Sequence, residues 1–182
     1  MIGLIKDTKL YTINVGDSRS FYQFKDEATG RICTAPISLI HSPDDEKESK
    51  RIREHNGYIK SLPSITSEFS ISRVFIDKNS LIGGLAMSRS IGDFDLRKYG
   101  VTSEPDIYEM DLKEKNVHAV LFGSDGLTTC YGTDRCFARL QSKPSAIEGL
   151  KKLIRDCFRD SFESSGRVYV DDMSGVYIEF TH

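Results

Sequence analysis

The sequence predicts an α+β fold in which mainly antiparallel β-sheets carry helices on the outside. Short segments that alternate apolar and polar residues follow one another closely along the chain, as adjacent antiparallel strands do. Helical signals are confined to one stretch in the first half and one near the end, so strands and helices do not alternate strictly. The 182 residues are enough to bury a core, and we expect a single domain over residues 1–182.

Strands are predicted where polar and apolar residues alternate, or where an apolar run lies between turn residues. They are expected at residues 2–5, 10–15, 20–24, 32–34, 73–76, 106–111, 117–122 and 175–180. Residues 117–122 form a nearly continuous apolar run, which is typical of a central strand that is buried on both faces. The polar residues 61–72 predict a loop.

The first helix is predicted to start at Ser42-Pro43. Ser42 can cap a helix, Pro43 suits its first turn, and the acidic residues that follow favour the positive end of the helix dipole. This helix should run to about His55 and stop at Asn56-Gly57.

The second helix is predicted from Pro144 to about Phe162. Apolar residues recur there at helical spacing and should form a stripe that packs on the core. The stripe consists of Ile147, Leu150, Ile154, Cys157 and Phe158.

The composition is that of an ordinary globular protein, with 38% hydrophobic and 29% charged residues and a net charge of −2. This balance gives no electrostatic reason to expect nucleic acid or an anionic membrane as a partner. No run reaches the length of a membrane span and no signal peptide opens the chain. The cysteines lack CxxC spacing, so we interpret them as reduced thiols of a cytoplasmic or nuclear protein. They are Cys33, Cys130, Cys136 and Cys157.

Acidic segments beside apolar runs are the strongest functional signal in the chain. They are Val15-Gly16-Asp17-Ser18-Arg19, Ile91-Gly92-Asp93-Phe94-Asp95, Gly123-Ser124-Asp125-Gly126 and Val170-Asp171-Asp172-Met173. Aspartates that end different strands can build an oxygen-rich pocket for a hard divalent cation. Carboxylates without Cys or His partners favour Mg²⁺ or Mn²⁺, which often act on phosphate esters.

Asp125 is the strongest single candidate, because it follows an apolar strand and precedes Gly126, where a ligand can approach the backbone closely. The alternative is an Asp that makes a local turn hydrogen bond. Asp171 and Asp172 repel each other unless a cation or solvent relieves the repulsion, so a solvated turn pair is the plain alternative there.

The other candidates have equally plain alternatives. Asp17 lies in a Gly-Asp-Ser-Arg turn and could pair with Arg19, and the Phe94 ring alone could anchor the loop of Asp93.

Two further signals are interpreted as structural. Ser88 has no evident base partner, which disfavours a Ser-His-Asp nucleophile. The mixed charges of the first helix, which include Glu48, are interpreted as a solvated face with ordinary ion pairs.

In combination, the segments resemble the metal-dependent protein phosphatase 2C (PPM-type) Ser/Thr phosphatases over about residues 2–180. Residues 10–19 resemble that family's strand and GDSR turn, residues 41–57 its H-x-P helix, residues 85–95 its L-A-V-S-R-A-L-G-D-F segment, residues 103–107 its S-x-P turn, residues 124–127 its SDGLWD box and residues 171–174 its DNMS box. Each motif alone is weak, but together they occur in the family's order.

The resemblance implies a β-sandwich of antiparallel sheets flanked by helices. It also implies Mg²⁺ or Mn²⁺ at one end of the sandwich, where the metal activates a water that attacks the phosphorus of phosphoserine or phosphothreonine. By resemblance Asp125 and Asp171 are metal ligands, and Asp17 lies near a weaker metal position. Supporting residues around the site would be Asp93, Asp172, Ser88 and Arg89.

The chain also departs from the family pattern. It matches the C-terminal two-thirds of the family domain, so the phosphate-gripping Arg and the Asp-Gly-His metal loop of the N-terminal third have no counterpart. Thr129 stands where the SDGLWD box has its second acid, and Asp172 stands where the DNMS box has an amide.

These departures leave alternatives open. The chain is interpreted as a phosphatase domain whose other part lies elsewhere, and alternatively as a pseudophosphatase scaffold that binds a protein partner without activity, or as an inactive fragment. Without the N-terminal strands we expect exposed sheet edges, and therefore self-association or a partner that covers them.

Overall fold

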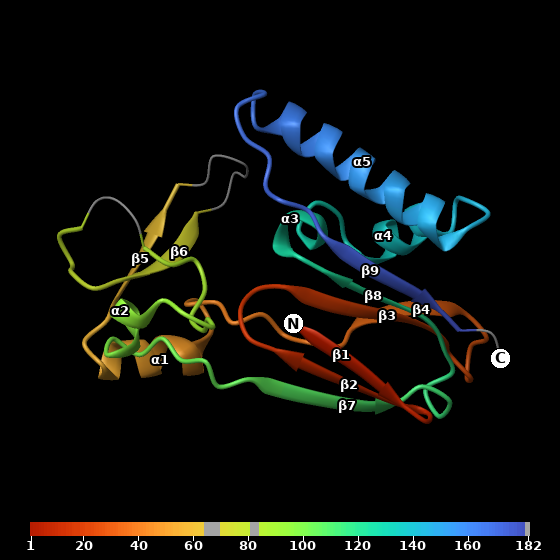
Figure 1. Cartoon of the computed structure of the whole chain (residues 1–182), viewed down its shortest axis with the longest axis horizontal. Helices are drawn as coiled ribbons and strands as arrows, with labels where there is room; N and C mark the ends of the chain where they lie inside the picture. The colour runs from red at the N-terminus through yellow and green to blue at the C-terminus, as the bar shows by residue number, and fades with distance from the viewer. Residues whose placement is uncertain (64–69, 81–83, 181–182) are drawn as a thin grey trace. The chain divides into compact units, whose positions relative to one another are not determined.

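The computed structural model describes residues 1–63, 70–80 and 84–180, which belong to two compact units (Figure 1). The first unit comprises residues 1–14, 18–39 and 107–182. The second comprises residues 15–17 and 40–106. Each unit has a hydrophobic core of its own.

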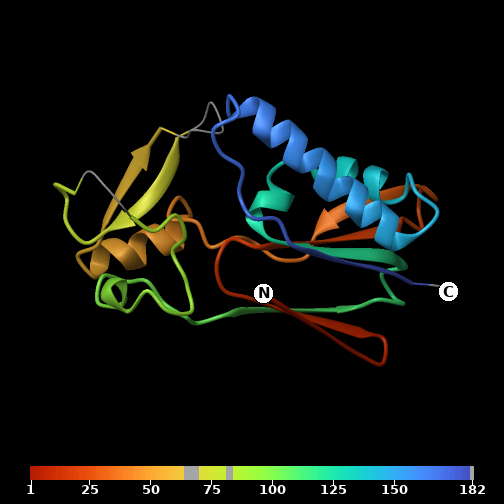
Figure 2. The same ribbon diagram turned by 45° about the horizontal axis from the view of Figure 1, so that its top comes forward.

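The first unit contains the two sheets of a sandwich. The three-stranded sheet has the order β1 (Ile2–Lys6), β2 (Lys9–Asn14), β7 (Asp106–Asp111). The four-stranded sheet has the order β4 (Ile32–Pro36), β3 (Arg19–Lys25), β8 (Val117–Gly123), β9 (Gly175–Glu179), and its neighbours pair antiparallel. Figure 2 shows the three-stranded sheet on one side of the four-stranded sheet and helices on the other.

Helices α3 (Asp125–Thr128), α4 (Thr133–Leu140) and α5 (Ala146–Ser164) belong to this unit. Ala119 and Leu121 of β8 pack into the core that includes α4 and α5. Val120, between them, packs into the core with β2 and β7 residues. The prediction of a central strand at residues 117–122 is therefore confirmed, as is the α+β class with antiparallel sheets flanked by helices.

The second predicted helix is α5, which Ser145 caps by accepting a hydrogen bond from the backbone N–H of Glu148 at 3.3 Å. Its predicted apolar stripe is wrong at both ends, because Ile147 is 63% exposed and Phe158 is 54% exposed. The buried face instead follows Gly149, Leu153 and Cys157, which recur every four residues. Leu150 and Ile154 lie beside that face and are partly buried.

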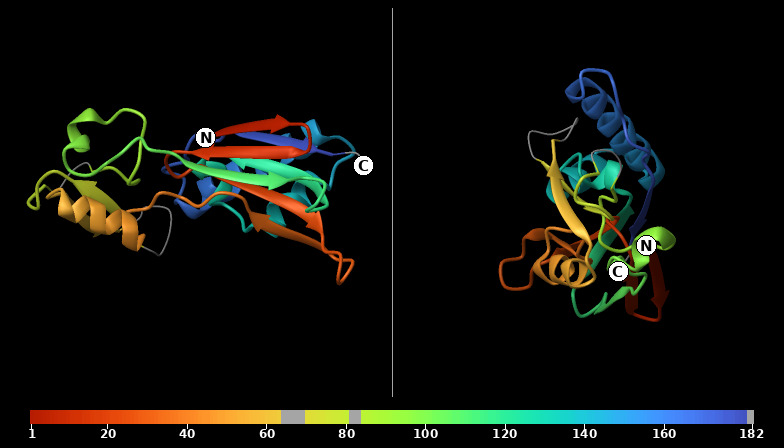
Figure 3. Two further views of the ribbon diagram at one scale, coloured as in Figure 1. Left: turned by 90° about the horizontal axis from the view of Figure 1, so that it is seen from below. Right: turned by 90° about the vertical axis from the view of Figure 1, so that its left-hand side faces the viewer.

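The second unit contains α1 (Glu46–Glu54), the hairpin of β5 (Tyr58–Leu62) and β6 (Ile71–Phe75), and the short α2 (Phe94–Arg97) (Figure 3). Its core consists of Ile52, Val74 and Val101. The predicted loop at residues 61–72 is wrong at its two ends, which belong to β5 and β6. Residues 64–69 of that prediction lie outside the described residues.

Helix α1 is capped by Asp45 rather than by the predicted Ser42. The Asp45 carboxylate accepts hydrogen bonds from the backbone N–H groups of Lys47 at 2.9 Å and Glu48 at 3.2 Å. Ser42 instead accepts from the backbone of Asp44 in the turn before the helix. The predicted stop is confirmed, since Asn56 adopts a φ of 59° and cannot continue the helix.

No helix in the described part of the chain is both long and apolar enough to cross a membrane. All four cysteines are free.

Gly149 lets α5 approach the C-terminal end of α4. A Cβ atom at this position would lie 2.0 Å from the carbonyl oxygen of Leu140, and backbone cannot swing away as a side chain can. Gly149→Ala should therefore lower the free energy of unfolding by about 1–3 kcal/mol, because the clash outweighs the gain in helix propensity of about 1 kcal/mol. Urea denaturation measures the change.

Gly132→Ala is the matched control, because a Cβ atom there meets nothing within 4 Å and the φ is −63°. Because Gly132 is the N-cap of α4, where glycine is preferred over alanine, we expect this change to lower the free energy of unfolding by at most about 1 kcal/mol, less than Gly149→Ala does. A stabilised Gly149→Ala variant, or equal losses in both variants, would contradict this packing.

Candidate functional site

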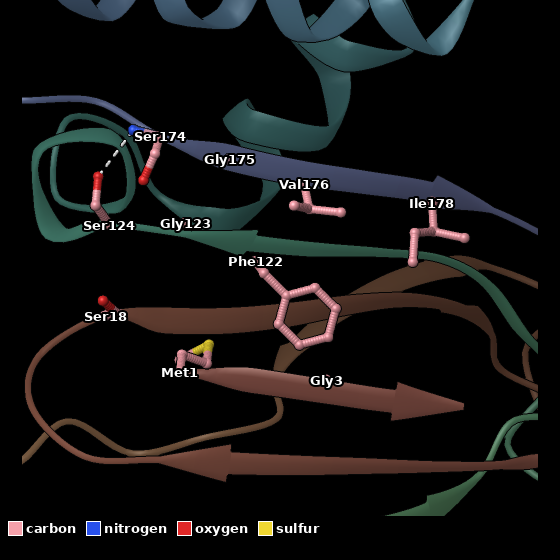
Figure 4. Close-up of a pocket in the computed structure, with 10 residues that line it drawn as sticks. All are labelled: Met1, Gly3, Ser18, Phe122, Gly123, Ser124, Ser174, Gly175, Val176 and Ile178. Atoms are coloured by element: carbon pink, nitrogen blue, oxygen red, sulfur yellow. Dashed lines mark hydrogen bonds between the residues drawn. The ribbon is translucent and has the colours of Figure 1, made fainter. Parts of the chain in front are cut away.

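The register of β8 against β9 brings two acidic segments to the same edge of the sheet. Gly123, the last residue of β8, lies opposite Gly175, the first residue of β9. The backbone N–H of Ser124 donates to the carbonyl oxygen of Ser174 at 3.0 Å, and the N–H of Ser174 donates to Ser124 Oγ at 3.0 Å (Figure 4). The chain after β8 and the chain before β9 are therefore joined where they meet.

Gly126 allows these two segments to touch. A Cβ atom at Gly126 would lie 2.6 Å from the carbonyl oxygen of Asp172 and 3.0 Å from Cβ of Asp171. Ser124 Oγ donates to the same carbonyl oxygen of Asp172 at 3.2 Å. Asp125, the first residue of α3, therefore lies in the segment directly against Asp171.

The electrostatics of Tyr169 reflect this convergence. The charge of Asp171 raises the pKa of the Tyr169 phenol, and burial and the charges of Asp125 and Asp172 raise it further. The charges of all three carboxylates therefore act on one hydroxyl group.

Asp125 also makes the local turn hydrogen bond that was its alternative role, and Asp171 makes a similar bond. Asp125 Oδ1 accepts from the backbone N–H of Gly126, and Asp171 Oδ1 accepts from the N–H of Asp172, each at 2.9 Å. These bonds orient the carboxylates, so the local role and a role in binding are compatible.

The pair is chemically suited to one hard cation, which takes carboxylate and carbonyl oxygens and keeps several waters. It offers fewer ligands than a two-metal centre needs, because the described residues contain no cluster of three or more His, Cys, Asp or Glu side chains that could hold a metal. Thr129 adds no charge, and its hydroxyl donates to the carbonyl oxygen of Asp125 at 2.7 Å.

Asp17 belongs to the second unit, in the turn that follows β2. His41 holds this turn at two points: the N–H of Gly16 donates to His41 Nδ1 at 3.0 Å, and the N–H of His41 donates to the carbonyl oxygen of Gly16 at 3.0 Å. The convergence of Asp17 with Asp125 stays a prediction.

Ser88 and Arg89 surround Glu48, whose side chain is buried within the second unit. Arg89 Nη2 contacts Glu48 Oε1 at 2.7 Å, and Arg51 Nη2 contacts Glu48 Oε2 at 2.8 Å. The Ser88 hydroxyl donates to the same carboxylate. The partner of Ser88 is thus a buried carboxylate rather than a histidine.

This cluster extends to the turn of Asp17. Arg89 Nη1 contacts Asp106 Oδ1 at 2.9 Å, and Asp106 Oδ2 lies 3.2 Å from His41 Nε2. Because His41 Nδ1 accepts from Gly16, the ring proton is on Nε2 and is donated to Asp106. We name Glu48, Arg51, Ser88, Arg89, Asp106 and His41 the Glu48 network.

The interpretation of the first helix as a solvated face is wrong at Glu48. The signal that could have found it is its spacing, since Glu48 lies three residues before Arg51 and four before the buried Ile52, on one helical face. The mixed charges of α1 favoured a solvated face, and most of its other charged side chains are exposed. Composition therefore did not distinguish Glu48 from them.

Asp93 begins α2 with a φ of 48° and makes no side-chain capping bond. With Asp95 it lines a hollow that Phe75 and Leu96 also line. The Phe94 ring does not anchor this loop, because Phe94 is 82% exposed.

Glu48 should make the stability of the protein sensitive to acid. Burial raises its pKa, but hydrogen bonds from Arg51, Arg89 and Ser88 outweigh burial and hold the pKa far below its usual range. The unfolded state therefore binds more protons, so the stabilisation is complete above the unfolded pKa of about 4.3 and is lost as the pH falls further below it. Between about pH 6 and pH 3, Glu48→Gln should lose less free energy of unfolding than the wild type.

At neutral pH the same variant should be less stable than the wild type, by about 3 kcal/mol, because it leaves two partly buried guanidinium groups without the Glu48 carboxylate. Glu54→Gln is the control: Glu54 is exposed and lies 3.9 Å from Lys50, so its loss should cost less than about 0.5 kcal/mol. Urea titrations of both variants at each pH measure these differences. Equal stabilities and equal acid sensitivity in the two variants would contradict the Glu48 network.

Comparison with known proteins gives a consistent picture. The family model "Protein phosphatase 2C" matches residues 1–163. "Probable protein phosphatase 2C 38" of Oryza sativa subsp. japonica is 37% identical over 166 residues, which cover 90% of this chain and 34% of that relative. "Protein phosphatase 2C homolog 2" of Hypocrea jecorina is 30% identical over 193 residues, which cover 100% of this chain and 38% of that relative. The chain thus spans little more than a third of these relatives.

Solved structures share the fold. The serine-threonine phosphatase 2C from Toxoplasma gondii superposes with a TM-score of 0.76 at 17% identity, over 96% of this chain and 55% of that one. A C. elegans sex determining protein superposes with a TM-score of 0.63 at 20% identity, over 93% of this chain and 36% of that one. With the family model matching most of the sequence, these findings identify the chain as a member of the protein phosphatase 2C family.

Proposed function

We propose that this chain is part of a protein Ser/Thr phosphatase that hydrolyses phosphoserine and phosphothreonine through a metal-activated water. The family assignment supports a phosphatase in general, because proteins of this family are metal-dependent and act on phosphoproteins. The observation that carries the proposal is the contact between the segments of Asp125 and Asp171 at the β8–β9 edge.

The proposed cation is Mg²⁺ or Mn²⁺, with Asp125 and Asp171 as its protein ligands and Asp17 near a weaker position. Such a cation, when bound, polarises a phosphoryl oxygen and lowers the pKa of a water. Asp172 adds negative charge beside the pair. Asp93, Ser88 and Arg89 are proposed as supporting residues, the last two through the Glu48 network.

The residues of this chain are proposed to position the two carboxylates and not to act as nucleophiles. The Ser124–Ser174 hydrogen bonds fix the two acidic segments relative to each other. Positioning is the main contribution of a protein to phosphoryl transfer, so this is a catalytic contribution without a covalent step. Ligands for a second ion are proposed to come from another chain, or from the part of the relatives' domain that these residues do not match.

Hydrolysis of an aryl phosphate by the purified chain, with and without Mn²⁺, tests the proposal. We expect turnover that depends on Mn²⁺ and that falls to the metal-free rate in Asp125→Asn, because the amide cannot replace the anionic ligand. Asp44→Asn, at an exposed position in the second unit, is the control and should keep the wild-type rate.

Turnover that persists without metal or in Asp125→Asn would contradict the proposed site. The absence of turnover in every variant would favour the alternative, a binding module of the same fold without activity.

We also propose that two copies of the chain associate through β1, the edge strand of the three-stranded sheet. Ile2 and Leu4 of β1 are 61% and 55% exposed, and the strand contains no proline that would block pairing. Sedimentation velocity should show a dimer that Leu4→Lys disrupts and that Leu39→Lys, at another exposed leucine, leaves intact. A wild-type monomer at all concentrations would contradict this.

A cytoplasmic or nuclear location is proposed because the four cysteines are free, as thiols are in those compartments.

A further inference from the structure

Three cysteines lie near the C-terminal end of α3. Cys130 follows α3, Cys136 lies in α4 and Cys157 lies in α5. Cys130 Sγ donates to the carbonyl oxygen of Cys157 at 3.7 Å, and Cys157 Sγ donates to the carbonyl oxygen of Leu127 at 3.8 Å. The Ser161 hydroxyl donates to Cys130 Sγ at 3.7 Å. Hydrogen bonds of the Cys130 and Cys157 thiols therefore link α5 to the end of α3.

The two thiols of the pair differ in exposure. Cys130 is partly exposed, whereas Cys157 is completely buried. An oxidant from solvent therefore meets Cys130 first, and the buried Cys157 lies directly behind it.

The two thiols also differ in acidity. The neighbouring Cys157 side chain lowers the pKa of Cys130 to about 7 against the opposing effect of burial, and a hydrogen bond from the Ser161 hydroxyl at 3.7 Å lowers it further. Arg139 acts in the same direction and Asp160 in the opposite one. The neighbouring Cys130 side chain and burial raise the pKa of Cys157. The thiolate, which is the form that reacts with peroxides, therefore belongs to Cys130.

We propose that Cys130 is a peroxide-sensitive thiol and that Cys157 is its resolving partner, so that oxidation forms a reversible disulfide between the end of α3 and α5. The proposal rests on the contact of Cys130 Sγ with the carbonyl oxygen of Cys157 at 3.7 Å, the partial exposure of Cys130 and the burial of Cys157. Cys136 is completely buried in α4 and Cys33 lies on β4, so neither has the same combination of exposure and contact.

The reaction consumes one hydrogen peroxide for each disulfide. The Cys130 thiolate attacks one peroxide oxygen, an S–O bond forms, the O–O bond breaks, and the departing hydroxide takes a proton and leaves as water. Cys157 then gives up its proton and attacks the Cys130 sulfur, the S–S bond forms, and the S–O bond breaks to release a second water. Two electrons pass from the pair of thiols to the peroxide.

Oxidation is also expected to affect the β8–β9 edge, because Asp125 and the start of α3 lie there. This consequence rests on the proposed function. Asp125 begins this helix, and oxidation removes the hydrogen bond from Cys157 to Leu127 within it. The disulfide would therefore change metal-dependent turnover by moving α3, and a reductant would restore it. The disulfide itself is measured without any activity assay, so its failure and the failure of the phosphatase proposal are separate results.

The experiment is a peptide map of the purified chain after treatment with hydrogen peroxide, with free thiols alkylated before the protein is unfolded. We expect an intact mass lower by about 2 Da, a cross-linked peptide that joins Cys130 to Cys157, and reversal by dithiothreitol. Cys130→Ser should abolish the cross-link, and the matched variant Cys33→Ser should leave it unchanged. In Cys157→Ala, dimedone should trap a sulfenic acid at Cys130.

Because Cys157 is completely buried, its alanine variant is expected to be less stable. The peptide map of the wild-type chain therefore decides by itself whether the disulfide forms. A cross-link that joins Cys130 to Cys136 or Cys33 would overturn the proposal. So would a wild-type map in which Cys130 stays reduced, or is oxidised to sulfinic acid without any cross-link.

Discussion

The candidate site depends on one constraint, the antiparallel pairing of β8 and β9 in a register that sets Gly123 opposite Gly175. A shift of one residue would turn the side chains of β9 to the opposite face and would separate the two acidic segments that meet at its start. The two glycines also leave room for α3 to pack on this pair of strands, because Cβ atoms at Gly123 and Gly175 would lie 2.6 and 2.7 Å from side chains of α3. The segments that carry Asp125 and Asp171 meet because of this pairing, although the two residues lie 46 positions apart in the sequence.

The sequence predicted the elements that carry strong local signals. The apolar run of β8 predicted a strand covered on both faces, and the motifs in their order predicted the family. Its failures occurred where tertiary packing outweighed local pattern. Ser42 was as good a cap as Asp45 by residue type, and only the path of the chain decides which carboxylate or hydroxyl faces the free N–H groups. Ile147 has helical spacing but lies outside the face that α4 covers.

The site was predictable in part, for similar reasons. A strand that ends in Asp and Gly indicates an exposed carboxylate, so Asp125 was identifiable from its neighbours alone. The pairing of Asp125 with Asp171 required long-range register, which only the family resemblance supplied. Glu48 was missed because a buried carboxylate between two arginines has the same composition as a solvated helix face. Its burial depends on Arg89, which lies 41 residues away in the sequence and has no local link to α1.

The central claim is that the β8–β9 edge presents two carboxylates that together hold one divalent cation. Electron paramagnetic resonance of Mn²⁺ measures this directly, because the signal of the free ion falls as the protein binds it. The account predicts one bound Mn²⁺ per chain that Mg²⁺ displaces, weaker binding in Asp171→Asn, and no binding when Asp125→Asn is combined with it. Unchanged Mn²⁺ binding in that double variant would show that the ion is held elsewhere and would contradict the account.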